Sequence, residues 1–148
     1  MALEDRPVRH WLPRALLEAG WAPAAVFSLH LVIARVLKLY LAYPRSDIVM
    51  HLLGGVAIAF FFRRAARRAA EGGLIGAING VGLAVIVFGL TCAAAVGWEF
   101  AEFASDRFLH TQSQLGLSDT LRDMLCGIVG GTAWAIAGLL REGGGKIE

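Results

Sequence analysis

Four long apolar stretches, separated by shorter polar segments, dominate the pattern of hydrophobic and polar positions along the chain. They run from about residue 21 to 43, from 46 to about 62, from 74 to beyond 98, and from 119 to 140. A helix that crosses the hydrocarbon core of a bilayer needs about 20 predominantly apolar residues. The pattern therefore predicts an all-α, polytopic membrane protein, a bundle of about four transmembrane helices.

The segments outside this bundle are short. Residues 1–20 are an N-terminal tail in which Trp11, Leu16 and Arg14 indicate a short amphipathic helix on the membrane surface. Residues 21–140 are the predicted four-helix transmembrane domain, and residues 141–148 are the C-terminal tail.

Local signals place the junctions between the spans. Pro44 ends the first span, and Ser46 or Asp47 is a suitable N-cap for the second. The third stretch is longer than a bilayer needs, so Asn79 and Gly80 are predicted to divide an interfacial turn from the span proper.

Basic residues are distributed unevenly, and this predicts the topology. The tails and the densest cluster, which is predicted to be a loop, hold nine Lys and Arg residues, against three at the other side. The positive-inside rule then predicts a multi-pass protein of the inner (plasma) membrane, with both termini in the cytoplasm. The cluster consists of Arg63, Arg64, Arg67 and Arg68.

Composition supports this class and excludes others. Hydrophobic residues make up 57% of the chain and charged residues 18%, which indicates lipid as the solvent. Cys92 and Cys126 lie in apolar stretches without a paired spacing, so no disulfide framework is expected. The arginine cluster is short and lies at a membrane boundary, where anionic headgroups explain it, so no nucleic acid partner is predicted.

Acidic residues and one histidine gather at the predicted outer ends of three spans. Their spacings of three or four residues place them on shared helix faces. At about 1.5 Å per residue, the second and fourth spans bring their acids to about 24–27 Å above the inner boundary. The third span brings its acids to the same height if it starts at residue 81. If it starts at residue 74, its acids lie farther out. The residues are Asp47 and His51, then Glu99, Glu102 and Asp106, then Asp119 and Asp123.

Two interpretations of this cluster remain open. In the structural one, Arg35 and Lys38 of the first span, together with Arg122, form a salt-bridge network with the acids. In the functional one, the excess of carboxylates binds a divalent metal ion, Mg, Mn or Zn. Its ligands would be Asp47, His51, Glu99, Asp119 and Asp123. Glu102 would be a general base, while Arg122, Arg35 or Lys38 would hold a phosphate.

The motifs that carry these residues resemble those of a known family. Trp98-Glu99-Phe100-Ala101-Glu102, then Ser118-Asp119-Thr120-Leu121-Arg122-Asp123, and the earlier Asp47-x-x-x-His51 resemble the signature of the YjdF-like inner-membrane proteins, and more loosely of the VanZ-like proteins. The resemblance covers roughly residues 46–131. It implies that Asp47, His51, Glu99, Glu102, Asp119 and Asp123 form one motif set, but it implies no particular activity.

The leading hypothesis is therefore an outward-facing polar site that binds a divalent cation and acts on a lipid-linked or phosphorylated substrate. A proton- or cation-conducting unit is the alternative, and a non-catalytic subunit of a larger membrane complex is a third. Expected partners are the lipid bilayer and, in an oligomer, further copies of the chain. His30 of the first span is interpreted as a packing residue.

Overall fold

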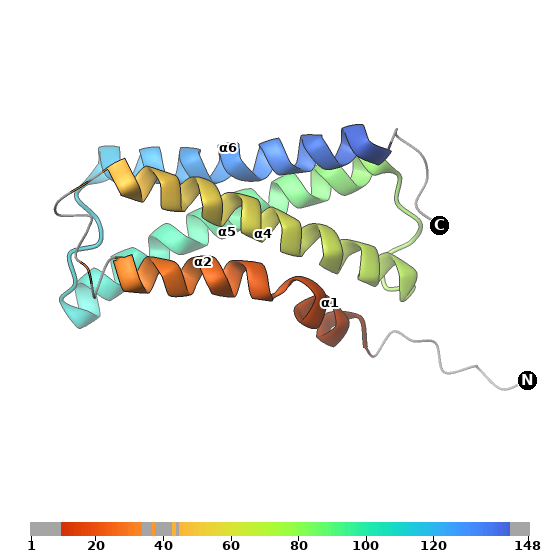
Figure 1. The fold of residues 1–148 in the computed structure, drawn as a ribbon, viewed down its shortest axis with the longest axis horizontal. Helices are drawn as coiled ribbons and strands as arrows, with labels where there is room; N and C mark the ends of the chain where they lie inside the picture. The colour runs from red at the N-terminus through yellow and green to blue at the C-terminus, as the bar shows by residue number, and fades with distance from the viewer. Residues whose placement is uncertain (1–9, 34–36, 38–42, 44, 143–148) are drawn as a thin grey trace, which may run out of the picture.

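The computed structural model describes residues 10–33, 37, 43 and 45–142, and within them it contains five α-helices and no β-strand. The prediction of an all-α protein is therefore confirmed (Figure 1). The helices are α1 (Trp11–Ala19), α2 (Trp21–Leu31), α4 (Arg45–Glu71), α5 (Gly80–Leu109) and α6 (Leu117–Glu142).

Three of these helices, α4, α5 and α6, are long and apolar enough to cross a membrane. The described part of the predicted first span is the shorter apolar helix α2. Residues 34–36, 38–42 and 44, which belong to the rest of that span and its connection, lie outside the described residues. Three spans are thus supported, and the fourth stays a prediction.

Helices α4 and α6 run in the same direction and form the most extensive helix contact among the described residues, while α5 and α2 run the opposite way (Figure 1). Trp21 at the start of α2 packs edge-on against Phe60 of α4. Near the other end of α2, Phe27 packs edge-on against Trp98 of α5. Aromatic contacts of this kind fix α2 along one side of the three long helices.

The start of α5 agrees with the prediction. The Asn79 side chain accepts a hydrogen bond from the Gly82 N–H at 2.7 Å, which satisfies one of the free donors of the first turn. Residues 74–79 therefore belong to the connection, and the span proper begins at Gly80. This is the shorter of the two spans considered, and it brings Glu99 to the height of the other acids.

Two predicted boundaries of α4 are wrong. The arginine cluster is not a loop, because α4 continues to Glu71. Ala65, Ala66 and Ala69 favour helix and are buried, so packing extends the helix past its apolar section. At the other end α4 begins at Arg45, and the Ser46 hydroxyl donates to the Tyr43 carbonyl at 2.6 Å instead of capping the helix.

The core is small, and large apolar side chains cover much of the outer surface. Its buried members are Ala59, Ala66, Leu83, Val87 and Ala135. Phe100, Val85 and Leu125 are each at least 60% exposed. Continuous exposure of this kind on long apolar helices is what a lipid-facing surface requires.

Candidate metal centre

Small residues bring the three long helices together one turn away from the polar cluster. A Cβ atom at Gly55 of α4 would clash with the Gly127 carbonyl of α6, so only glycine permits this approach. A Cβ at Gly127 would in turn lie 3.6 Å from the Ala95 Cβ of α5. The three backbones therefore cross closely at this level.

The polar side chains lie on the same helix faces as these small residues. His51 precedes Gly55 by four residues, Asp123 precedes Gly127 by four, and Glu99 follows Ala95 by four. Residues four apart share a helix face. Because α5 runs opposite to α4 and α6, the crossing turns all three polar side chains toward one another at the same end of the bundle.

The first candidate ligand group consists of Asp47, His51 and Asp123. The His51 Nε2 atom lies 3.5 Å from Asp47 Oδ1 and 4.0 Å from Asp123 Oδ2. One ligand atom from each residue falls within 4.8 Å of the others. The Asp123 side chain is only 3% exposed, and those of His51 and Asp47 are partly buried.

The second group shares His51 and adds Glu99 and Glu102 of α5, again with ligand atoms within 4.8 Å of one another. Glu102 is oriented by the Trp98 indole N–H, which donates to its Oε1 at 2.9 Å. Trp98 and Glu102 are four residues apart, so this contact follows from their shared helix face. The sequence motif contains Trp98, but its positioning role was not predicted.

Glu99 is the most informative member, because it is only 5% exposed. The Gln114 side-chain amide donates to the Glu99 carbonyl at 3.0 Å and to its Oε2 at 3.2 Å. The other carboxylate oxygen, Oε1, is buried and has no hydrogen-bond partner among the described residues. A buried carboxylate oxygen without a donor is costly, and a cation is one group that satisfies it.

Asp106 organises the connection that supplies Gln114. Its Oδ1 accepts hydrogen bonds from the Thr111 hydroxyl and from the Ser113 N–H at 2.8 Å, and its Oδ2 accepts from the Gln114 N–H at 2.9 Å. Asp106 therefore closes the loop between α5 and α6 and holds Gln114 against Glu99. Sequence reasoning placed Asp106 with the clustered acids and did not predict this role.

Asp119 and Arg122 form an ion pair at the edge of the cluster. Arg122 binds an Asp119 carboxylate oxygen and also donates from Nε to Asp123 Oδ1 at 3.3 Å. Asp119 accepts the Leu115 N–H as well, at 3.1 Å. This is the Arg122 part of the predicted salt-bridge network, and Asp119 belongs to neither ligand group found among the described residues.

Arg35 and Lys38 lie outside the described residues. His30 packs edge-on against Trp98, with ring centroids 5.3 Å apart, which agrees with its interpretation as a packing residue.

An apolar pocket of about 250 Å³ adjoins the cluster, between α2 and the three long helices. His51 forms part of its wall, and Val26, Met50 and Trp98 are among the other lining residues. Its volume exceeds that of the cavity of about 150 Å³ that holds a benzene ring in an engineered protein. The pocket therefore has room for a segment of an alkyl chain with one end at His51.

A family model described as a predicted membrane protein family, DUF2238, matches residues 18–143. The chain belongs to this family. YjdF-like proteins are members of it, so the resemblance holds at family level, while the narrower YjdF or VanZ naming is not shown. No curated protein matches the chain, and no solved structure does.

Proposed function

We propose that this membrane protein binds a divalent cation where α4, α5 and α6 converge, and that the cation holds the phosphate of an amphiphilic substrate. One observation carries the proposal: two ligand groups share His51, and one of them includes the buried Glu99 Oε1 atom, which lacks a hydrogen-bond partner among the described residues. The proposed ligands are Asp47, His51, Glu99 and Asp123, and Glu102 lies beside them without being a ligand.

The chemistry of these side chains narrows the choice of ion. Carboxylate oxygens suit hard cations such as Mg²⁺ and Mn²⁺, and an imidazole nitrogen extends the choice to Zn²⁺. Carboxylates crowded away from water must bind protons or cations, because their mutual repulsion is poorly screened there. Arg122 supplies one positive charge near Asp123, which leaves the cluster rich in negative charge.

The neighbouring pocket supports an amphiphilic substrate. An alkyl chain in the apolar pocket would end near His51, which also belongs to both ligand groups. A headgroup phosphate would then lie beside the cation, where Arg122, with 43% of its side chain exposed, is positioned to contact it. Glu102, held by Trp98, is the candidate general base for a hydrolytic reaction.

The orientation belongs to the same proposal. The C-terminal end of α4 carries the arginine cluster, the C-terminal end of α6 carries Arg141, and the polar cluster lies at the opposite end of both helices. We place the arginine-rich end in the cytoplasm of an inner membrane and the cluster at its outer side, as the positive-inside rule predicts.

A conducting function has less support from the described residues. Among the described residues, the buried core between the two ends of the long helices is mainly apolar, with Leu83 and Val87, and its one buried hydroxyl, on Thr91, donates to the Val87 carbonyl at 2.8 Å. A proton or cation path requires polar side chains or water along its length. The apolar core favours a closed binding site over conduction through a single chain.

Metal analysis of the purified protein tests the proposal. We expect a bound divalent metal by elemental analysis and a saturable Mn²⁺ titration by calorimetry. Glu99→Gln should weaken Mn²⁺ binding by at least about tenfold, since it removes the charge of a buried ligand. Glu71→Gln is the matched control, because Glu71 pairs with Arg68 far from the cluster. Equal binding by both variants and the wild type would refute the metal site.

A further inference from the structure

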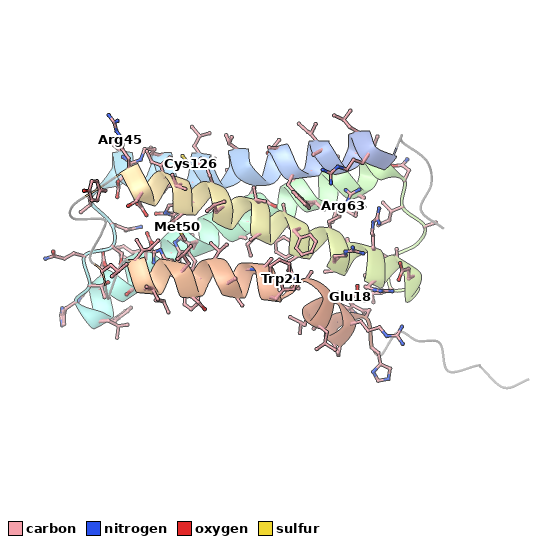
Figure 2. All side chains as sticks on the ribbon, viewed as in Figure 1. Glu18, Trp21, Arg45, Met50, Arg63 and Cys126 are labelled. Carbon is pink, nitrogen blue, oxygen red and sulfur yellow. The ribbon has the colours of Figure 1, made fainter. Side chains whose placement is uncertain are left out.

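A second pocket, of about 160 Å³, lies between α4 and α6 at the end opposite the polar cluster. Four arginines line it: Arg63, Arg64 and Arg67 from α4, and Arg141 from α6. Figure 2 shows Arg63 toward this end of α4 and Met50, which lines the apolar pocket, toward the other. The two pockets thus occupy separate parts of the bundle.

The sequence makes room for one of these guanidinium groups. Arg63 is only 7% exposed, and its side chain lies against the backbone of Gly138 in α6. A Cβ atom at Gly138 would come within 2.6 Å of the Arg63 Cζ atom and 2.7 Å of Nη1. Gly138 therefore provides a recess that fixes Arg63 at the pocket wall.

Trp134 adds a hydrogen-bond donor to the same wall. Its ring packs edge-on against Phe60, with centroids 5.8 Å apart. Its indole N–H is buried and has no acceptor in the part of the chain that the structure describes. Because buried tryptophan N–H groups usually have a partner, this donor is consistent with an acceptor that binds in the pocket.

The neighbouring Arg68 lies outside this pocket and has its own carboxylate partners. Arg68 binds both Glu18 of α1 and Glu71 of its own helix, and it does not line the pocket. Those two carboxylates are thus committed outside the pocket. The pocket itself gathers four positive charges around a volume suited to a small anion.

We propose that this pocket binds the phosphate group of an anionic ligand, with guanidinium groups and the Trp134 N–H as donors. Guanidinium groups match the oxygens of phosphate with paired hydrogen bonds. The phosphate can come from an acidic lipid headgroup or from a soluble phosphate. Basic pockets between transmembrane helices bind acidic headgroups, so the lipid is the favoured source.

Short-chain lipids separate the two sources. The purified full-length protein is titrated by calorimetry with dihexanoyl-phosphatidylglycerol, dihexanoyl-phosphatidylcholine and inorganic phosphate. We expect the anionic phosphatidylglycerol to bind and the zwitterionic phosphatidylcholine to bind much more weakly. If inorganic phosphate binds and competes with phosphatidylglycerol, the pocket would be assigned to soluble phosphate. Binding of neither anion would overturn the proposal.

Two variants of equal charge locate the binding. Arg67→Gln should weaken binding about tenfold, the loss expected for one charge-assisted hydrogen bond. Arg68→Gln removes the same charge one position away and should leave binding unchanged. If both variants lost the same amount of binding, the loss would be a general charge effect, and the proposal that the anion binds in this pocket would be overturned.

Gly138→Ala is the second test, because it retains every charge and places a methyl group where Arg63 lies. Phosphate binding should fall, while Mn²⁺ binding at the other end remains and reports that the protein is folded. Unchanged phosphate binding in this variant would contradict the assigned role of Arg63.

Discussion

The two ends of the α4–α6 pair are built from the same helices but carry opposite charges. Both helices begin at the acidic end, with Asp47 and Asp119 in their first turns, and both finish at the basic end, with Arg68 and Arg141 in their last turns. Helix dipoles favour this arrangement, since they stabilise acids at N-termini and bases at C-termini. Part of the charge separation is therefore ordinary helix electrostatics.

Helix dipoles do not account for every charged residue at the two ends. Glu99 and Glu102 lie in α5 about two turns or more before its last residue, Leu109, so no helix N-terminus of α5 stabilises their carboxylates. Glu99 is also buried, and one of its carboxylate oxygens has no hydrogen-bond donor within the described part of the chain. At the basic end, Arg63 is buried against Gly138 although a solvated position would be less costly. Glu99 and Arg63 belong to the two sites for which we propose ligands.

The largest effect is expected from a variant that disrupts the crossing of α4 and α6, which brings the acidic residues together. Gly55→Ala introduces a Cβ that clashes with the Gly127 carbonyl, so α4 and α6 must separate. Overpacking of this kind costs roughly 1–3 kcal/mol. We expect a lower unfolding midpoint in SDS titrations of mixed micelles, together with a loss of Mn²⁺ binding.

Gly54→Ala is the control for this prediction. Gly54 is the neighbouring residue, and a Cβ there meets nothing within 4 Å. Alanine is the better helix former by about 1 kcal/mol, so this variant should be as stable as the wild type or more so. If both variants behaved alike, the Gly55–Gly127 contact would not be what holds the helices together.

The sequence predicted much of the acidic end because its signals are local. Spacings of four residues place Asp47 with His51, and hydropathy with helix rise predicts a common height for the three spans. The Asn79 cap, which decides the height of Glu99, was also readable as a helix start. What connects the helices was not predictable, because the pairing of Gly55 with Gly127 depends on how two distant segments pack.

Roles that depend on the loop between α5 and α6 were also out of reach. Gln114 contacts Glu99 only because Asp106 binds the loop backbone, and no periodic pattern encodes that fold. The arginine cluster was misassigned for a related reason. Charge density indicated a loop, but the buried alanines between the arginines extend α4, and the pocket with Arg141 appears only when α6 is in place.

A smaller effect distinguishes two aspartates on the same helix of the acidic end. Asp123→Asn removes a buried ligand, whereas Asp119→Asn removes a partner of Arg122 that lies outside both ligand groups. Because a bound ion stabilises the folded state, Mn²⁺ should raise the Tm of the wild type and of Asp119→Asn. It should not raise the Tm of Asp123→Asn. If Mn²⁺ raised the Tm of both variants equally, Asp123 would not be a ligand of the ion.

The smallest expected effect concerns the basic end, where α1 is held to α4 by Glu18 and Arg68. The hydrogen bond from Arg68 holds the pKa of the Glu18 carboxyl below its ordinary value of 4.5. Since the pKa is lower in the folded state, Glu18 stabilises docked α1 above pH 4.5, and this contribution is lost as the pH falls through the folded-state pKa. A spin label at Leu17→Cys, an exposed position of α1, should become more mobile in that range.

Glu18→Gln should remove the pH dependence of the label's mobility, whereas Glu71→Gln, which affects Arg68 only within α4, should retain it. A label whose mobility did not change with pH in the wild type would mean that contacts other than this ion pair hold α1 in place.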